Sequence, residues 1–299
     1  MALTLGIDIG GTNVRLGLVT KVCELSGFTQ LKTESVFTSD SPIADLAIVI
    51  ENYLDDCGKK EEVISVAIGF PSTVDKDAKV VLSTPNIPML QNVPVVDDLS
   101  KRLKLPIFIN RDVNFLMLFD IHYQKLNTAG VLLGFYFGTG IGNALFIDGK
   151  SLRGKNGVTA ELGHIPMIHD DSLCSCGNVG CLENHASGKY LVSLIDSDFP
   201  GIDVSDIFSL HANHPKILTF IENTAIAVAI EVNLLDPEFI VLGGGVLQMK
   251  DFPKSLLEER IKARARKPFP SENLEIIYAT DGQENGVIGA GIYAFEQLR

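Results

Sequence analysis

The sequence predicts an α/β protein with two domains of related architecture. A length of 299 residues is more than one hydrophobic core usually supports. Two glycine turns, "DIGGTN" and "GTGIGN", are each flanked by apolar stretches that read as strands. Mixed strand and helix patterns follow each turn, and this repeated order indicates a duplicated α/β arrangement.

The first half begins with two strands joined by the turn "GGTN". Between Ser41 and Gly58 apolar residues recur at helical spacing, and Pro42 stands in the first turn, so a helix is expected there. The predicted elements in order are strands at 3–9, 14–20 and near 32–37, the helix at 42–57, a strand at 63–70, a hairpin at 74–81, a helix around 94–104, a strand at 106–110 and a helix at 111–124.

The second half repeats this outline. Its predicted elements are strands at 131–138 and 142–148 around the turn "TGI", a cysteine-containing loop, several helices, strands at 239–246 and 274–280, and a closing helix at 286–298. The duplication lies in the order of elements, because the two halves share no clear sequence repeat.

Composition and charge limit the classes of partner. Apolar residues make up 46% and charged residues 21% of the chain, as in soluble globular proteins. The formal net charge of −12 argues against a nucleic-acid backbone or an anionic membrane as main partner, but not against a small nucleotide. No run approaches the roughly 18 apolar residues of a membrane span. Because "MALTLGIDIGG" also lacks signal-peptide features, we expect a cytoplasmic protein with reduced thiols.

The glycine turns are candidate phosphate-binding loops. Glycine lets a ligand approach the backbone amides, which can bind phosphate oxygens. Neither turn is a Walker loop or a dinucleotide fingerprint, because no Gly-Lys-Ser/Thr follows and the next element is a strand. Each alone could be an ordinary hairpin, whereas the two together with "GGG" at 243–245 indicate a nucleotide held between the domains. Asp8, just before the first turn, could orient Mg²⁺ or simply cap the turn.

A cysteine cluster marks the second half. Three of the five cysteines lie within eight positions, and a histidine stands ten residues before the first, the four residues being His164, Cys174, Cys176 and Cys181. Three thiolates and one imidazole form the closed tetrahedral set that structural Zn²⁺ prefers. A reducing location and an odd cysteine number disfavour a disulfide, and buried free thiols are the remaining alternative. His169 and His185 are interpreted as surface residues.

Three carboxylates are candidates for chemistry on a sugar. Asp112 follows the strand at 106–110 and begins a helix, which is a usual position for a site residue. There it could take a proton during phosphoryl transfer to a hydroxyl, or serve only as a helix-start aspartate. Glu161 and Glu183 bracket the cysteine loop, so a metal-ordered loop could aim both at sugar hydroxyls. Both could equally be solvated.

Three segments together carry a family resemblance: "GIDIGGTNVRLGLV", "GTGIGNALFIDGKSLRGKNGVTAELGHI" and "CSCGNVGCLENHASG". They resemble the ROK family of sugar kinases and repressors over nearly the whole chain. The resemblance implies an actin/hexokinase-like (ribonuclease H-like) duplicated fold with an interdomain cleft. It further implies a small domain of residues 1–113 plus 286–299, a larger domain of 114–285 with the zinc loop, and a homodimer. Within the family, "GFPSTVDKDAKVVLSTPNIP" and "NRDVNFLM" are most similar to bacterial D-allose kinases.

The resemblance also implies roles for individual residues. Asp112 matches the general base that deprotonates the 6-hydroxyl of a sugar for attack on the γ-phosphate of ATP. The positions that match ATP contacts are Asp8, Gly10, Gly11, Thr12, Asn13, Gly138, Thr139, Gly140, Gly142, Gly244 and Gly245. The positions expected at the sugar are Thr84, Asn86, Arg111, Glu161, His164 and Glu183, and His164 doubles as a zinc ligand.

The sequence departs from the family pattern at two places. The usual Glu-Asn-Asp is Asn110-Arg111-Asp112 here, and Asn143 stands where glycine is commoner. The guanidinium of Arg111 offers forked donors in place of an amide, and we hypothesise that it selects a sugar with altered C3 stereochemistry, as in allose. Buried polar groups left unpaired by the wrong epimer would cost about 1–3 kcal/mol each.

The resulting expectation is an ATP-dependent hexose 6-kinase that acts on D-allose and requires ATP, Mg²⁺ and structural Zn²⁺. N-acetylmannosamine and glucose are the alternative substrates. A sugar-responsive repressor of the same family is a distant alternative, because only "MA" precedes the first strand and no basic DNA-reading helix is apparent. A non-catalytic sugar-binding module is a further alternative, which both glycine turns and Asp112 disfavour.

Overall fold

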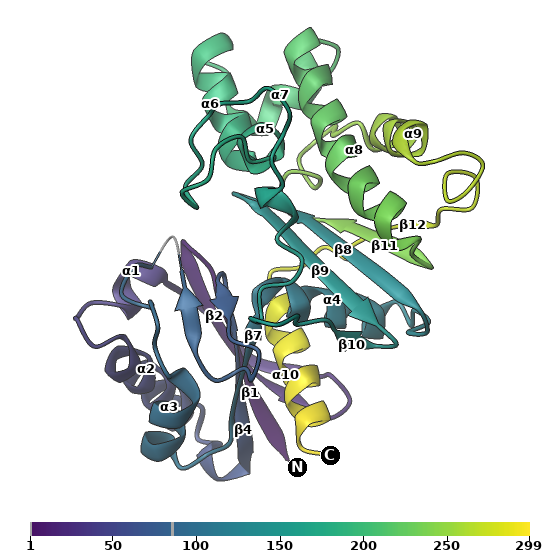
Figure 1. The fold of residues 1–299 in the computed structure, drawn as a ribbon. Coiled ribbons are helices and arrows are strands. Elements are labelled where there is room, and N and C mark those ends of the chain that lie inside the picture. Colours follow the sequence, from purple (N-terminus) through teal and green to yellow (C-terminus); the bar gives the residue numbers. More distant parts are fainter. Residues whose placement is uncertain (1, 85–86) are drawn as a thin grey trace. The chain divides into compact units, whose positions relative to one another are not determined.

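A computed structural model describes residues 2–84 and 87–299. The chain forms two compact units (Figure 1). Unit 1 consists of Met1–Leu126, Arg153–Thr159 and Gly282–Arg299, and unit 2 of Asn127–Leu152 and Ala160–Asp281. Each unit is built around a five-stranded sheet with its own hydrophobic core.

The sheet of unit 1 has the strand order β3-β2-β1-β4-β7. Its strands are β1 (Leu3–Ile9), β2 (Asn13–Thr20), β3 (Leu25–Lys32), β4 (Val63–Phe70) and β7 (Ile107–Arg111). β1, β2 and β3 pair antiparallel, whereas β1, β4 and β7 pair parallel. In this register Asp8 lies opposite Gly69, and Gly69 lies opposite Asn110, so these positions share the carboxyl edge of the parallel strands.

The third strand was predicted in the wrong place. Residues 25–32 form β3, and Thr33–Val36 form the short helix α1 instead of continuing a strand. β3 is an edge strand with no fully buried residue, so it lacks the apolar alternation by which strands are recognised in a sequence. The remaining predicted elements of unit 1 are confirmed, with bounds of α2 (Pro42–Cys57), β5 (Thr73–Val74), β6 (Val81–Ser83), α3 (Val95–Leu103), α4 (Asp112–Tyr123) and α10 (Asn285–Gln297).

The predicted boundary after residue 113 would cut α4, but this helix remains in unit 1. The reason is its close packing on α10. A Cβ added at Gly289 of α10 would lie 1.9 Å from the carbonyl oxygen of Phe115 in α4. On its other side α10 lies directly on β1, where a Cβ at Gly6 would lie 2.1 Å from the carbonyl oxygen of Val287. The boundary predicted before residue 286 also differs, because unit 1 resumes at Gly282.

Unit 2 repeats the topology of unit 1. Its sheet has the order β10-β9-β8-β11-β12, with β8, β9 and β10 antiparallel and β8, β11 and β12 parallel. The strands are β8 (Val131–Phe137), β9 (Ile141–Ile147), β10 (Lys150–Ser151), β11 (Phe239–Gly243) and β12 (Ile276–Tyr278). The two sheets share one strand order and one pattern of directions, which confirms the duplicated α/β architecture.

Helices cover the sheet of unit 2 (Figure 1). They are α5 (Glu183–Ala186), α6 (Gly188–Asp198), α7 (Ile207–His211), α8 (Pro215–Leu235) and α9 (Lys254–Arg264), with the 3₁₀ turn η2 (Leu162–His164) before the cysteine loop. α8 is long and apolar enough to pass a length-and-composition test for a membrane span. It is a core helix of unit 2, because more than half of it is buried and Phe220, Ala225 and Val228 are fully enclosed.

Candidate active site

Asp8 lies near the carboxyl end of β1 and faces Arg15 across the first hairpin. The two residues are directly opposite each other in the strand register, and Arg15 Nη1 lies 3.3 Å from Asp8 Oδ2. Nε of Arg15 also donates to Oε1 of Gln30 on β3 over 3.1 Å, which fixes the guanidinium. Burial raises the pKa of Asp8, and the charge of Arg15 opposes this rise. The side chain of Asp8 remains 15% exposed, so a small cation could reach it.

Asp112 begins α4 immediately after β7. Its pKa is raised to about 7, first because burial disfavours the charged form and second because the Asp8 carboxylate adds a like charge. The backbone N–H of Val113 donates to Asp112 Oδ1 over 2.8 Å, and Arg111 also favours the charged form, but neither effect reverses the rise. A carboxylate whose pKa lies near neutrality can accept a proton during a reaction and release it afterwards.

The first glycine turn is held closed from two sides. Within the turn, Gly10 N–H donates to the Asn13 carbonyl over 2.8 Å. From outside, Thr33 donates twice, from its backbone N–H to the Thr12 carbonyl over 3.0 Å and from its hydroxyl to the Gly10 carbonyl over 2.7 Å. These bonds occupy carbonyl groups and the Gly10 amide. The turn therefore has a fixed shape before any ligand binds.

Arg111 and Asn110 shape the edge beside Asp112. Nη1 of Arg111 donates to the carbonyl oxygen of Thr159 over 2.7 Å. Oδ1 of Asn110 accepts from the Arg111 N–H over 2.9 Å and from Nδ2 of Asn114 over 2.8 Å. Nδ2 of Asn110 is buried and has no hydrogen-bond partner among the described residues.

Thr84 and Asn86 are the two loop residues expected at the sugar. Thr84 directly follows β6, is 3% exposed, and donates its hydroxyl to the Leu90 carbonyl over 3.3 Å. This bond ties the hydroxyl into its own loop, so Thr84 supports that loop. Asn86 lies outside the described residues.

The second glycine turn, between β8 and β9, is fastened to the start of α6. Gly188 N–H donates to the Gly138 carbonyl over 2.8 Å, and Lys189 N–H donates to the Thr139 carbonyl over 3.0 Å. A Cβ at Gly188 would lie 2.5 Å from the Gly138 carbonyl oxygen, so a larger residue would push the turn away. The first amides of α6 therefore hold the turn instead of facing a ligand.

Glu183 braces the same turn from the end of the cysteine loop. Its Oε2 accepts the Ile141 N–H over 2.9 Å. A Cβ at Gly140 would lie 2.5 Å from this oxygen, so a larger residue there would displace the carboxylate. Glu183 thus supports the turn that is predicted to bind ATP. Only a sugar contact was predicted for this residue from the sequence.

The third glycine stretch packs on the end of β8. Gly244 has a φ of 93°, and a Cβ there would lie 2.4 Å from backbone atoms of Phe137. Val246 N–H donates to the Phe137 carbonyl over 2.9 Å. A Cβ at Gly245 would meet nothing within 4 Å, so the backbone at 245 is open on that side. The carboxyl ends of the parallel strands β8 and β11 thus carry the glycines predicted to contact ATP.

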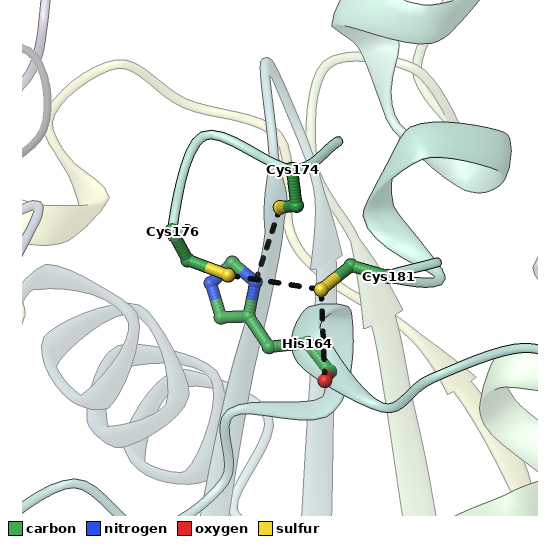
Figure 2. Close-up of side chains that lie close together, drawn as sticks. All are labelled: His164, Cys174, Cys176 and Cys181. Carbon is green, nitrogen blue, oxygen red and sulfur yellow. Dashed lines mark hydrogen bonds between the residues drawn. The ribbon is translucent and has the colours of Figure 1, made fainter. Parts of the chain in front are cut away.

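The three cysteines and His164 converge in unit 2 (Figure 2). Their ligand atoms all lie within 4.8 Å of one another. Sγ of Cys174 lies 3.7 Å from Nδ1 of His164, and the sulfurs of Cys176 and Cys181 lie 3.7 Å apart. A tetrahedral Zn²⁺ with Zn–S bonds of about 2.3 Å requires edges of about 3.8 Å, so the donor set fits this ion. The spacing far exceeds an S–S bond, and all five cysteines are free, so the disulfide alternative is wrong.

Groups around the cluster hold its ligands in place. Nε2 of His164, the ring nitrogen on the far side from the sulfurs, lies 3.6 Å from Oε2 of Glu161. A carboxylate behind a ligating imidazole is a common means of orienting the ring. Asp170 accepts from His185 over 2.7 Å and from the Ser172 hydroxyl over 2.8 Å, which closes the loop at its base. His185 is half-buried in this network, so its interpretation as a surface residue is wrong.

Asn143, the second departure from the family pattern, has a partner in the core of unit 2. Nδ2 of Asn143 donates to Oε2 of Glu231 over 3.0 Å and to the Gly134 carbonyl over 3.1 Å. Asn143 is fully buried and Glu231 is 8% exposed. The asparagine thus faces α8 and partners a buried carboxylate, so it is a structural residue of the sheet and lies off the predicted phosphate turn.

The predicted site residues fall into one group in each unit. Unit 1 brings together Asp8, the turn at 10–13, Arg111 and Asp112, and unit 2 brings together the turn at 138–142, residues 244–245, Glu161, Glu183 and the metal cluster. Sequence reasoning missed Thr33, Arg15 and Gly188, which shape these groups. Only Arg15 carried a usable signal, because the hairpin register places it opposite a residue of opposite charge.

Known proteins share both the sequence pattern and this architecture. The model of the ROK family matches residues 4–297. A glucokinase of Halalkalibacterium halodurans is 28% identical over 96% of this chain and 93% of its own length, and an N-acetyl-D-glucosamine kinase of Pectobacterium carotovorum is 29% identical over 96% and 97%. Among solved structures, a ROK family glucokinase from Streptomyces griseus in complex with glucose and AMPPNP is 26% identical, with a TM-score of 0.77 over 99% of this chain and 100% of that one.

These likenesses extend over the whole architecture and are not restricted to one motif. The two related sheets have the actin/hexokinase-like arrangement of the matching kinases. The family match covers nearly all of both units, including both glycine turns and the cysteine loop. The chain therefore belongs to the ROK family.

Proposed function

We propose that this protein is an ATP-dependent kinase that transfers the γ-phosphoryl group of ATP to the 6-hydroxyl of a hexose. The observation that carries the proposal is the position of Asp112, which begins α4 directly after β7, beside the edge that carries Asp8 and the first glycine turn; its pKa, raised to about 7, fits a proton acceptor. Such a group is poised to accept the proton of a hydroxyl near neutral pH. The kinase activities named for ROK relatives over nearly their full length support the same reaction.

In the proposed reaction Asp112 takes the proton of the 6-hydroxyl while the hydroxyl oxygen attacks the γ-phosphorus. The bond between this phosphorus and the β,γ-bridging oxygen breaks, and ADP leaves. Backbone N–H groups of the two glycine turns are the proposed phosphate donors, because backbone dipoles can stabilise charge at fixed positions. Asp8 would hold Mg²⁺, which neutralises phosphate charge when bound, and its partly exposed carboxylate suits this hard cation.

A structural Zn²⁺ is proposed for His164 and the three cysteines. With four protein donors the ion has no open position, so its role is to fix the loop that leads into Glu183. Glu161 behind the imidazole would orient the ring. Glu161, Glu183 and His164 are the proposed sugar contacts. The ion itself would take no part in the chemical step, because all four of its positions would be filled by protein donors.

D-allose is the proposed substrate within this class. The support is the replacement of the family asparagine by Arg111 and the resemblance of segments 70–89 and 110–117 to D-allose kinases. The bond to Thr159 holds the guanidinium in a defined orientation, which a residue that discriminates between epimers needs. Glucose, N-acetylglucosamine and N-acetylmannosamine are the competing substrates. A homodimer and a cytoplasmic location stay predictions.

A coupled assay of ADP release with a sugar panel tests the proposal. The panel contains allose, glucose, mannose, fructose, N-acetylglucosamine and N-acetylmannosamine, each with MgATP, and a sugar-free reaction measures background hydrolysis. We expect sugar-dependent ADP release with the highest kcat/KM for allose. A higher kcat/KM for another sugar would make that sugar the substrate in place of allose. ADP release that no sugar stimulates would refute the kinase proposal.

A further inference from the structure

Residues 153–159 form a segment that we call the strap. They lie between β10 and η2, both of which belong to unit 2, yet the strap itself is part of unit 1. Its tip, Lys155 and Asn156, is exposed, whereas Gly157 is buried. A short loop that leaves its own unit in this way needs specific bonds to hold it, and the structure contains them at both ends.

The first end of the strap is fastened by Arg153. Nη2 of Arg153 donates to the Tyr293 hydroxyl on α10 over 2.7 Å, and Nη1 donates to the Lys76 carbonyl over 3.0 Å. Tyr293 is 7% exposed, and its ring packs on Phe115 at a centroid distance of 5.3 Å. The acceptor is therefore fixed, and Arg153 joins it to the β5–β6 hairpin.

The middle of the strap lies directly on that hairpin. Gly157 has a φ of 83°, and a Cβ there would lie 2.1 Å from the Val74 carbonyl oxygen. The hairpin is rigid at this point, because Asp75 Oδ1 accepts the N–H groups of Lys79 and Val80, each over 2.7 Å. The same hairpin leads through β6 into Thr84, in the segment predicted to border the sugar.

The other end of the strap is fastened by Arg111, whose Nη1 donates to the Thr159 carbonyl over 2.7 Å. Arg111 directly precedes Asp112, the proposed base. Thr159 is followed after one residue by Glu161, and η2 then carries His164. The strap thus contacts two parts of unit 1: Arg111 at the end of β7, next to the proposed base, and the β5–β6 hairpin, which leads to Thr84. Beyond Thr159 the chain continues into Glu161 and His164, two of the proposed sugar contacts.

We propose that the strap is a positioning element for the sugar and that Arg153 is its positioning residue. This inference rests on the proposed kinase function. With Arg153 and Tyr293 bonded, the backbone that leads to Glu161 is ordered before the sugar binds, so binding does not have to order it. Arg153 touches no reacting atom in this account. Because neither glycine turn is part of the strap, loosening it should weaken sugar binding and leave ATP binding unchanged.

Two variants and a matched control test the strap. Tyr293→Phe removes one hydroxyl and keeps the packed ring, and Arg153→Met removes both donors. Arg102→Met is the control, because it deletes an arginine whose hydrogen bonds go to Glu51 and Ala44 of α2 and to neither the strap nor a proposed site residue. We expect each strap variant to raise the sugar KM about fivefold or more, with the ATP KM within about twofold of the parent. Arg153→Lys should recover part of the loss, and the double variant should be no worse than Arg153→Met alone.

Hydrogen exchange of residues 157–164 supplies a second readout that needs no activity. Exchange should accelerate there in both strap variants and stay at the parent rate in Arg102→Met. A parent protein that phosphorylates no sugar would refute the kinase proposal while exchange still reports on the strap. An unchanged exchange rate, an unchanged sugar KM in an active enzyme, or equal rises in the sugar and ATP KM would each overturn the proposed role of the strap. Thermal melting confirms that each variant is folded before these comparisons.

Discussion

Glu183 accepts a hydrogen bond from the backbone N–H of Ile141 over 2.9 Å, and this bond joins the end of the cysteine loop to the second glycine turn. The glutamate was predicted to contact sugar and the turn to contact ATP. Since one oxygen of Glu183 holds the turn, a change at this residue should reach both substrates. Gly140 leaves room for the contact, because a side chain there would lie against the carboxylate and displace it.

Glu183→Ala is therefore expected to raise the KM for ATP as well as the KM for sugar, each about fivefold or more, since the turn loses its brace. Glu183→Gln keeps an oxygen that can accept the Ile141 N–H, so it should leave the ATP KM near that of the parent. Steady-state kinetics with each substrate varied in turn measures both effects. An ATP KM that is unchanged in Glu183→Ala would restrict this residue to the sugar.

Asp112→Asn should lower kcat by at least about a hundredfold, because the amide cannot take the proton of the attacking hydroxyl. Zinc content and the affinity for a non-hydrolysable ATP analogue should stay close to the parent values, which separates loss of the base from loss of the fold. Initial rates, metal analysis and calorimetric titration provide these three measurements. Turnover within about tenfold of the parent would assign the base to another group.

The raised pKa of Asp112 predicts a rate that depends on pH. The base must be ionised to work, and its pKa is about 7 instead of the ordinary 3.8, so activity should rise as the pH climbs through about 7. Below that pH the carboxyl is protonated and inactive. Initial rates between pH 5.5 and 9, at limiting concentrations of both substrates, report the free enzyme. A flat profile across this range would contradict the assignment of this pKa to the base.

Metal analysis of the purified protein should find about one zinc per chain. Cys176→Ser and Cys181→Ser each remove one of the four donors, so both should reduce the zinc content and make the loop between His164 and Glu183 more sensitive to protease. Cys57→Ser is the matched control, because Cys57 lies at the end of α2 in unit 1. If protein purified without chelator contains no zinc, the zinc-site prediction is wrong and the cysteines are free thiols.

Arg111→Asn restores the residue that is usual in the family. If Arg111 selects the sugar, the variant should lose about tenfold of the preference for allose over glucose, measured as the ratio of the two kcat/KM values. The expected reason is that an amide presents one donor group and one acceptor where the guanidinium presents only donors. A ratio equal to that of the parent would remove Arg111 from the discrimination of epimers.

Local signals in the sequence explain which parts of the fold could be predicted. α2 has a proline in its first turn and a left-handed glycine after its last, and both ends were found correctly. β3 was misplaced because an edge strand without buried residues has no apolar alternation. The strap was missed altogether, since its bonds to Tyr293 and Lys76 join residues far apart in the chain.

In the candidate site, too, features with a local sequence signal could be predicted and features that depend on distant residues could not. The metal cluster could be predicted because the chemistry of Zn²⁺ requires few residue types at short spacing. The braces on the glycine turns could not, because Thr33 and Gly188 are ordinary residues whose role depends on tertiary structure. Asn143 is a third case, since its departure from the family pattern was visible but its partner, Glu231, is 88 residues away.

The position of α10 on β1 has a consequence for synthesis on the ribosome. The sheet of unit 1 is encoded early, yet α10, which packs on Gly6 of β1 and through its own Gly289 on Phe115 of α4, belongs to the later stretch Gly282–Arg299. A nascent chain that has emerged only as far as β7 leaves that face of the sheet uncovered, with apolar side chains open to chaperones. All residues of unit 2 are synthesised before Gly282–Arg299. Unit 1, whose synthesis begins first, therefore completes its fold last.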